Sequence, residues 1–320
     1  MENKKISVIV SVYNEQEVLQ HFHEEITGVI SGMGISYEIV YINDGSVDLS
    51  QEILASAAAE DPSVKVINFS RNFGHEAAMI AGIDHSCGEF LVCIDADLEK
   101  PPAELPRMYQ AFLEGNDIVN MVYRDDQNRN KARKIMTKLY YKFLNSIARI
   151  RFTENSSDFF GISRTVADIL KVDYRERKRY IRGFIQSMGY RSTSLEYIPG
   201  KRYAGSSKYN FRALMNLAEV AIINFSGKPL RLGFYLSALC LLMTLGDTVL
   251  LAKDIIMRTG GMHFDLLTLI ALLLFTLTFF LMGVIGIYLE DIQQECRKDP
   301  IYHIKDGLNL DSEAKMPLHK

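Results

Sequence analysis

Two carboxylates one residue apart, Asp95 and Asp97, directly follow an apolar run at residues 89–94 that is typical of a buried strand. Side chains on the turn leaving such a strand can both reach one divalent cation, and a cation held by oxygen ligands can neutralise a diphosphate. Aspartate is also common in turns, because its side chain bonds to the local backbone. The pair alone therefore leaves both interpretations open.

The elements that would position this pair follow from the first 125 residues, in which short β-rich apolar runs alternate with segments of helical periodicity. This pattern predicts βαβ units and a mostly parallel sheet, with strands at residues 6–12, 38–42, 64–69, 90–94 and 118–123. The first four strands are each followed by a polar cluster: Tyr13-Asn14-Glu15, Asn43-Asp44-Gly45-Ser46, Ser70-Arg71-Asn72 and Asp95-Ala96-Asp97. Ligands of open α/β sheets bind outside the carboxyl ends of the strands, so we expect these clusters to line one crevice.

Asp44 has two interpretations. Its carboxylate could accept a hydrogen bond from a nucleobase imide N–H, with Gly45 permitting close backbone approach, or Asn-Asp-Gly could simply form a tight turn. The dinucleotide fingerprint GxGxxG is absent after the first expected strand, and the P-loop pattern GxxxxGK is absent as well. Both common alternatives for a nucleotide-binding α/β domain are thereby weakened.

The 320 residues have a hydrophobic fraction of 48%, but the apolar residues are unevenly distributed. Residues 232–252 contain one acid, Asp247, and residues 266–289 contain no charge, so each segment could cross a bilayer as a helix of roughly 20 residues. Two spans place both termini on one side. Basic residues flank the outer ends of the pair, which predicts that both termini are cytoplasmic: Lys228, Arg231, Arg297 and Lys298.

Two further segments have helical periodicity and lie next to these spans. The basic stretch at 124–134 leads into an amphipathic segment at 136–147, and a second precedes the first span at 211–225. Each could be an ordinary surface helix, but the adjacent spans favour helices at the membrane surface. The expected organisation is a cytoplasmic α/β domain at 1–210, a juxtamembrane helix at 211–229, a two-span hairpin at 230–290 and a cytoplasmic tail at 291–320.

The four cysteines are scattered singly, which indicates reduced structural thiols, and a net charge of −3 gives no support for a nucleic-acid partner. Taken together, the motifs resemble glycosyltransferase family 2, and within it the membrane-anchored polyprenyl-phosphate sugar transferases. The resemblance covers residues 5–300 and rests on 10–15, 43–46, 70–75, 95–98 with Pro101-Pro102, 182–184 and 202–209. It implies a Rossmann-like (GT-A type) α/β fold and self-association into a homo-oligomer.

The resemblance also implies roles for particular residues. Asp44 would bind the nucleobase, and Asp95 and Asp97 would hold Mg²⁺ or Mn²⁺ on the diphosphate of a nucleotide sugar. Asp158 would lie near the reacting sugar. Further positions match motifs for the nucleotide sugar, the phosphates or the lipid acceptor phosphate: Tyr13, Glu15, Arg71, Arg202 and Lys208 for the donor, and Arg124 and Arg133 for the acceptor. Solvated surface charge is the ordinary alternative for such basic residues.

The reaction implied is inverting transfer of a hexose from a UDP-sugar to undecaprenyl or another polyprenyl phosphate at the cytoplasmic face. The phosphate oxygen is already anionic, so the main requirement is stabilisation of the departing diphosphate. Two departures bear on the substrate. Glu99-Lys100 stands where the family usually has Gln-Asp, so Glu99 could add a third carboxylate to the metal site, and the chain contains no Trp. The alternatives are a GDP-mannose or UDP-aminoarabinose donor, a processive polysaccharide synthase, and a non-catalytic membrane scaffold.

Overall fold

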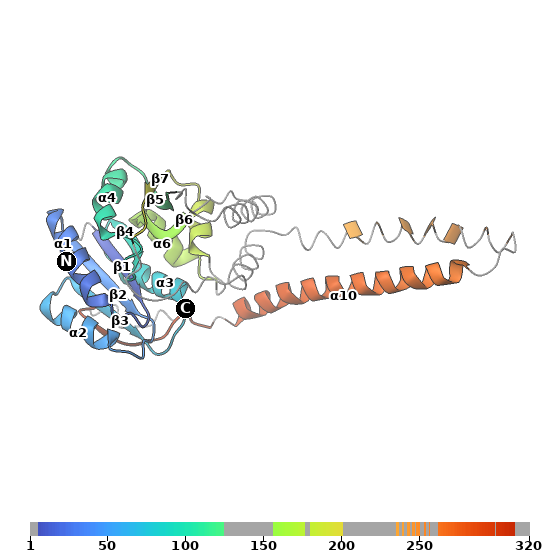
Figure 1. The fold of residues 1–320 in the computed structure, drawn as a ribbon, viewed down its shortest axis with the longest axis horizontal. Coiled ribbons are helices and arrows are strands. Elements are labelled where there is room, and N and C mark those ends of the chain that lie inside the picture. Colours follow the sequence, from blue (N-terminus) through green and yellow to red (C-terminus); the bar gives the residue numbers. More distant parts are fainter. Residues whose placement is uncertain are drawn as a thin grey trace.

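The computed structural model of the chain describes residues 6–124, 156–176, 180–200, 262–297 and 299–310, with isolated positions between 235 and 256. An α/β domain lies at one end of the molecule (Figure 1). The long helix α10 (Met262–Cys296) projects from this domain, and the chain then returns to it (Figure 1).

One eight-stranded sheet organises the α/β domain, in the order β7-β5-β6-β4-β1-β2-β3-β8. Strands β1 to β4 run parallel to one another, as do β5 and β7, whereas β6 and β8 run antiparallel to their neighbours. The strands are β1 (Ile6–Val12), β2 (Tyr37–Asn43), β3 (Val64–Phe69), β4 (Phe90–Asp95), β5 (Ile118–Tyr123), β6 (Ser156–Ser163), β7 (Ser192–Tyr197) and β8 (Ile304–Leu308). The five strands expected from the sequence are confirmed to within one residue, and so is the mostly parallel sheet.

Helices cover both faces of the sheet, because its central strands are nearly continuous apolar runs that must be buried on both sides. One face is covered by α1 (Leu19–Gly32), α2 (Ser50–Glu60) and α4 (Leu105–Leu113), which follows the 3₁₀ turn η1 (Pro102–Glu104). The other face is covered by α3 (His75–His85), α6 (Arg164–Asp173) and α7 (Ile181–Ser187). The architecture is therefore a three-layer α/β/α sandwich.

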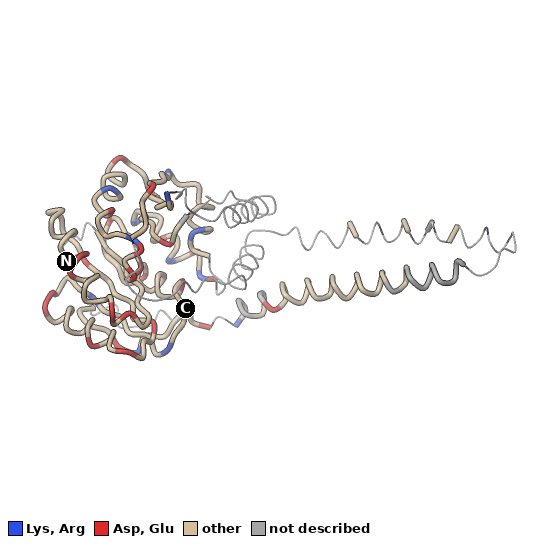
Figure 2. The backbone as a smooth tube through the Cα atoms, viewed as in Figure 1, with Lys and Arg blue, Asp and Glu red and all other residues tan. Residues whose placement is uncertain are grey.

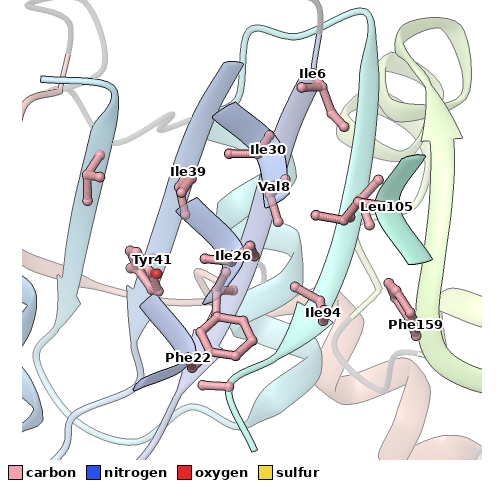
Figure 3. Close-up of a cluster of buried hydrophobic side chains, with 14 of the residues drawn as sticks. Ile6, Val8, Phe22, Ile26, Ile30, Ile39, Tyr41, Ile94, Leu105 and Phe159 are labelled. Carbon is pink, nitrogen blue, oxygen red and sulfur yellow. The ribbon is translucent and has the colours of Figure 1, made fainter. Parts of the chain in front are cut away.

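The spacing of apolar residues in α1 explains how this helix seats on the sheet. Phe22, Ile26 and Ile30 recur every four residues, which places them on one side of the helix. Figure 3 shows them packed against strand residues that include Val8 and Ile39, and all five side chains are fully buried. This packing fixes β1 and β2, from whose carboxyl ends two of the polar clusters emerge.

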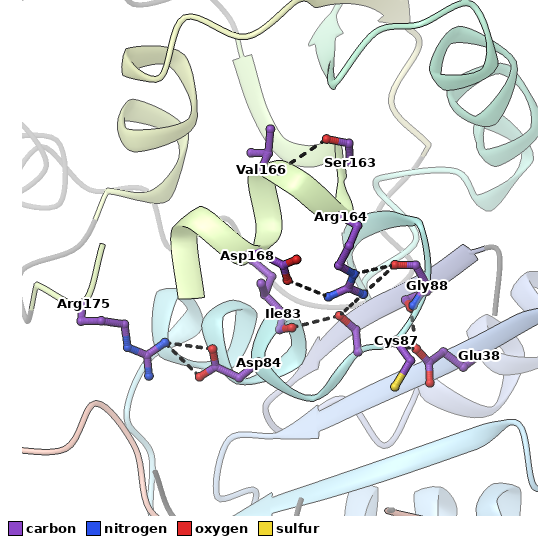
Figure 4. A network of polar contacts seen from close by, with 12 residues as sticks. Glu38, Ile83, Asp84, Cys87, Gly88, Ser163, Arg164, Val166, Asp168 and Arg175 are labelled. Carbon is purple, nitrogen blue, oxygen red and sulfur yellow. Dashed lines mark hydrogen bonds and ion pairs between the residues drawn. The ribbon is translucent and has the colours of Figure 1, made fainter. Parts of the chain in front are cut away.

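Charged side chains fasten α3 and α6 at the amino end of β4 (Figure 4). The Arg164 guanidinium donates to the Gly88 carbonyl oxygen from Nε at 2.9 Å and from Nη2 at 2.6 Å. Arg175 Nη1 donates to both carboxylate oxygens of the buried Asp84, at 2.9 and 3.0 Å. These bonds satisfy buried groups at the edge of the sheet opposite the polar clusters, so the network is structural.

Among the described residues, one helix is long and apolar enough to cross a bilayer, namely α10, over Leu273–Glu290. Along the part of α10 that is coloured in Figure 2, charged residues lie only near the end that joins the α/β domain, and residues 266–289 contain no charge. This helix corresponds to the second of the two expected spans. The isolated described positions of the first expected span are helical, but most of residues 232–252 lie outside the described part of the chain, as do Asp247 and the expected helices at 136–147 and 211–229. Two spans are therefore not established by the structure.

The segment after α10 contains a structural element that its sequence did not suggest. Residues 304–308, expected within a tail, form β8 and pair antiparallel with β3. The pairing gives hydrogen-bond partners to the backbone groups of β3 that would otherwise form an open sheet edge. The α/β domain thus includes residues from both sides of α10 in the sequence.

Candidate active site

Three of the four polar clusters meet at one pocket at the carboxyl edge of the sheet, through Tyr13, Asp44 and Asn72, and the fourth adjoins it because Ser11, which also lines the pocket, donates to Asp95. A pocket of about 140 Å³ opens there. It is lined by residues from the ends of β1 and β2 and from the start of α3: Ser11, Val12, Tyr13, Asp44, Asn72, Gly74, His75 and Ala78. A larger depression of about 540 Å³ lies between α1 and α2, but its lining combines amides, a hydroxyl and carboxylates with apolar side chains and includes no cation. We therefore place the candidate active site at the strand ends.

Asp44 connects two loops of this pocket. Its side chain is almost fully buried, and its oxygens accept hydrogen bonds from the backbone N–H groups of Phe73 at 2.6 Å and Gly74 at 3.0 Å. Burial raises the pKa of Asp44, and the two N–H bonds partly offset that rise. Asp44 therefore holds the 73–74 backbone in place, in addition to any contact that its remaining lone pairs make.

Gly45 allows the same two loops to approach closely. Its backbone φ of +69° is rarely adopted by residues that carry a Cβ. A Cβ at this position would also lie 2.5 Å from the Arg71 carbonyl carbon and 2.7 Å from the Asn72 nitrogen. Both neighbouring atoms belong to the backbone and cannot rotate away. Only glycine fits at this position without moving the loop that carries Arg71.

Asp95 is engaged by three side chains. The Lys100 ammonium, 4% exposed, forms an ion pair with Asp95 Oδ2, while Ser11 Oγ donates to Oδ1 at 3.1 Å. His75 Nδ1 lies 2.8 Å from Ser11 Oγ and 3.4 Å from Asp95 Oδ1. Burial opposes the charged carboxylate, but Lys100 and His75 outweigh that effect and lower the pKa of Asp95 to about 2. Asp95 is therefore a fixed anion.

Asp158 lies next to this group because of the antiparallel strand β6. The β4–β6 register ends with Cys93 paired to Phe160, and Asp158, two residues before Phe160, is close enough to Asp95 for the two charges to interact. Arg182, from α7, forms an ion pair with Asp158 at 2.8 Å between Nε and Oδ1, although its N–H is not aligned as a hydrogen bond. Burial opposes ionisation of Asp158, but Arg182 and Lys100 lower its pKa overall. The tertiary fold thus supplies a second anion beside the first.

Asp97 lies on the turn after β4, where its Oδ1 accepts the Glu99 N–H at 3.1 Å. The turn is tight, since Leu98 has a φ of +58°. Within the described residues no group of three His, Cys, Asp or Glu side chains is placed to hold a metal, so Asp95, Asp97 and Glu99 do not form a ready three-ligand cluster. Because Lys100 pairs with Asp95, Asp97 is the stronger candidate of the two carboxylates for a cation ligand.

The other expected site residues are spread along the same edge or lie outside the described chain. Tyr13 is 40% exposed and lines the pocket. Arg71 is exposed and stacks on the Phe73 ring at 4.0 Å, and Arg124 follows β5 with its N–H bonded to the Tyr197 carbonyl oxygen. Glu15 caps the start of α1 with its carbonyl oxygen. Arg133, Arg202 and Lys208 lie outside the described residues.

Several residues of the site had no role assigned from the sequence. Lys100 and His75 contact Asp95, Arg182 pairs with Asp158, and Gly200 supports the turn at Asp97. The Gly200 N–H donates to the Glu99 carbonyl oxygen at 3.0 Å, and a Cβ on Gly200 would lie 2.4 Å from the Leu98 carbonyl oxygen. Two features of the sequence could have pointed to these residues: Lys100 is a basic residue next to the acidic motif at 95–99, and Pro199-Gly200 directly precedes the basic motif at 202–209.

Glu76, at the start of α3, gives the site a measurable pH dependence. Burial and the neighbouring Asp158 raise its pKa from 4.5 to about 7. The folded chain then binds more protons than the unfolded chain between those values, so its free energy of unfolding falls as pH rises through that window. In the native chain we expect the free energy of unfolding to fall by about 2 kcal/mol across this window, a value already reduced for the partial exposure of Glu76. The Glu76→Gln variant should lack this fall.

Thermal denaturation of both proteins at pH 5 and pH 8 would measure this difference. The glutamine oxygen of the variant can still accept the Ile181 N–H, which Glu76 Oε2 accepts at 3.0 Å, so the contact is retained. Glu114→Gln, at an exposed position, is the control and should follow the native curve. Parallel native and Glu76→Gln curves would contradict the assignment.

Comparison with known proteins gives consistent matches. Residues 7–170 match the model of the family described as glycosyl transferase family 2. The chain is 31% identical to an uncharacterized glycosyltransferase of Synechocystis, covering 99% of this chain and 98% of that protein. It is 32% identical to the bactoprenol glucosyl transferase of Shigella phage SfX, covering 94% and 99%. Among solved structures, the glucosyl-3-phosphoglycerate synthase of Mycobacterium tuberculosis is 16% identical, with a TM-score of 0.47 over 69% of this chain and 78% of that chain.

Proposed function

The chain belongs to glycosyl transferase family 2 and is a glycosyltransferase, and we propose that it transfers a hexose from a UDP-sugar to a polyprenyl phosphate with inversion at the anomeric carbon. Glucose and N-acetylglucosamine are the preferred sugars. The acceptor is suggested by the relatives of similar length whose names describe glucosyl transfer to bactoprenol. We place the reaction at the cytoplasmic face of the membrane.

The observation that carries this proposal is the convergence of three carboxyl groups from distant parts of the sequence at the edge of the sheet where the pocket opens. Asp44 directly follows β2, Asp95 and Asp158 lie in β4 and β6, and each is held by partners that fix its position. Side chains fixed in this way need little reorganisation during a reaction. A scaffold that only bound a partner would not need two fixed carboxylates, each paired with its own buried cation.

A divalent cation fits the residues present. Mg²⁺ is commonly bound by one or two carboxylates together with substrate phosphates, and Asp97, with Asp95 beside it, offers that minimum. Such an ion would supply charge stabilisation to the departing diphosphate. The cation site is assigned to these two carboxylates, because Glu99 forms no preformed three-ligand group with them within the described residues.

The remaining steps are assigned to this chain's own side chains. Asp44 and the backbone of residues 73–74 that it holds would contact the nucleobase, and Arg71 would lie beside the nucleotide. The acceptor phosphate oxygen would attack the anomeric carbon from the side of Asp158 as the bond to the diphosphate breaks. Arg124, exposed at the end of β5, would attract the acceptor phosphate. Arg133, Arg202 and Lys208 are proposed for the same phosphates from their sequence motifs.

The fold brings this pocket close to a helix suited to a membrane. The apolar window of α10 is exposed, and exposed apolar surface of this extent indicates a lipid or protein contact. Ile304 pairs with Phe69 at the carboxyl end of β3, only eight residues after the last residue of α10. Eight extended residues span at most about 28 Å, so this end of β3 lies within about 28 Å of the end of α10.

The test is a donor panel offered to the purified full-length chain in lipid nanodiscs with undecaprenyl phosphate. The donors are UDP-glucose, UDP-N-acetylglucosamine, GDP-mannose and a UDP-aminoarabinose derivative, and mass spectrometry identifies the lipid product. We expect a single lipid product, an undecaprenyl-phosphate hexose, formed from one of the two UDP-hexoses. A product from only one of the other two donors would correct the sugar assignment, and no lipid product from any donor would refute the function.

Gly200→Ala is expected to lower this transfer by about 100-fold with little change in melting temperature. The new Cβ would collide with the Leu98 carbonyl oxygen and shift the turn that carries Asp97. A displacement of about 1 Å in a catalytic group can cost that factor. Gly28→Ala, where a Cβ meets nothing within 4 Å, is the matched control. Native transfer rates in Gly200→Ala would show that the turn does not position the reacting groups.

A further inference from the structure

A directed series of side-chain hydrogen bonds runs from β8 to the loop after β2. Asn68 Nδ2 donates to Asp306 Oδ1 at 2.5 Å, and Asn68 Oδ1 accepts from Asn43 Nδ2 at 2.9 Å. Asn43 Oδ1 then accepts the Ser46 N–H at 3.0 Å. Because an ionised carboxylate can only accept, Asp306 sets the orientation of both buried amides. The series ends on the loop that contains Asp44 and Gly45.

A second set of contacts joins the same C-terminal segment to the other loop of the pocket. The Ser70 N–H donates to the His303 carbonyl oxygen at 3.0 Å. The Tyr302 ring stacks on Phe69 at 5.2 Å between centroids, and the His303 ring lies 5.8 Å from Phe73. Phe73 is one of the two residues whose N–H groups bind Asp44. Both loops that meet at Asp44 are therefore held by the segment after α10.

The energetic consequence follows from the burial of Asn43 and Asn68, which are 2% and 3% exposed. Removing the acceptor at Asp306 leaves the Asn68 amide without the partner that fixes its direction, and a flipped Asn68 would place a donor against the donor of Asn43. Buried donors that face each other cost more than a lost bond alone. The loop bearing Asp44 would then sample other conformations.

From these contacts we propose that Asp306, in β8, is a positioning residue for the Asp44 loop and through it supports the donor-binding site. The proposal rests on the proposed function for its effect on catalysis. It assigns to the segment after the membrane-suited helix a role in binding the water-soluble nucleotide sugar. The same short connection, residues 297–303, links α10 to this segment, so the pocket and the helix are tied together by one stretch of chain.

The test compares Asp306→Ala, Asp306→Asn and Lys305→Ala in the full-length chain. Hydrogen–deuterium exchange should show faster exchange at residues 43–47 in Asp306→Ala than in the native chain. The KM for UDP-glucose, or for whichever donor the native chain uses, should rise about tenfold, with kcat and the KM for undecaprenyl phosphate within about twofold. Asp306→Asn, which keeps an acceptor oxygen, should restore most of the native behaviour. Lys305→Ala, at an exposed neighbouring position, should change nothing.

Two results would overturn the proposal. One is a native rate of hydrogen exchange at residues 43–47 in Asp306→Ala. The other is an equal rise in the KM values for the donor and the acceptor, which would indicate general destabilisation. The exchange measurement needs no substrate, so it decides the positioning role even if the native chain transfers no sugar. Failure of the proposed function and failure of this inference are therefore separable.

Discussion

An Asp97→Asn variant is expected to transfer sugar at least about 1,000-fold more slowly than the native chain while remaining folded. The asparagine oxygen can still accept the Glu99 N–H, so the turn should persist. What is lost is the carboxylate charge that would hold the cation on the diphosphate. Such a cation contributes several kcal/mol, and each 1.4 kcal/mol is about tenfold in rate. Initial rates of lipid product and Mn²⁺ binding by electron paramagnetic resonance both measure the effect.

Asp61→Asn is the matched control for this variant. Asp61 Oδ1 accepts the N–H of Ser63, two residues further on, in the same local arrangement, but at the amino end of β3 and away from the pocket. It should transfer sugar at the native rate and bind Mn²⁺ like the native chain. Unchanged turnover in Asp97→Asn would remove the metal from the mechanism.

Lys100→Met is expected to lower the free energy of unfolding by about 3 kcal/mol at pH 7 and to abolish most transfer. The ammonium is buried and paired with Asp95, and removing one member of a buried pair leaves an uncompensated charge. The pKa of Asp95, now about 2, should rise without Lys100. In the native chain this depressed pKa contributes stability above about pH 4 that is lost as pH falls toward 2. The variant should therefore show less acid sensitivity, which thermal denaturation from pH 3 to pH 7 can measure.

A double-mutant cycle separates the ion pair from simple packing. Lys100→Met combined with Asp95→Asn should regain much of the lost stability, because no charge is then left unpaired. Transfer should stay low, since Asp95 itself belongs to the site. Additive losses of stability in the double variant would mean that the two side chains do not stabilise each other.

The sequence by itself determined the centre of the fold and the edge of the sheet where the candidate site lies. Strands β1 to β5 are short runs of β-branched and apolar residues buried on both faces, so their signal is local and strong. Parallel strands place all their carboxyl ends on one edge, and this rule alone predicted that Asp44 and Asp95 would meet. The apolar run that forms α10 was equally easy to recognise, because a stretch of about 20 uncharged, mostly apolar residues indicates a helix long enough to cross a bilayer.

Tertiary structure decided what those residues touch. Strand β8 reads Ile-Lys-Asp-Gly-Leu, with a glycine and two charges, and it becomes a strand because the edge of β3 offers backbone partners. Asp158 reaches Asp95 only because β6 runs antiparallel, which no local pattern specified. The pairing of Lys100 with Asp95 likewise depends on a burial that sequence cannot supply. Local periodicity fixes elements and edges, whereas hydrogen-bond partners and charge states arise from contacts between residues far apart in the chain.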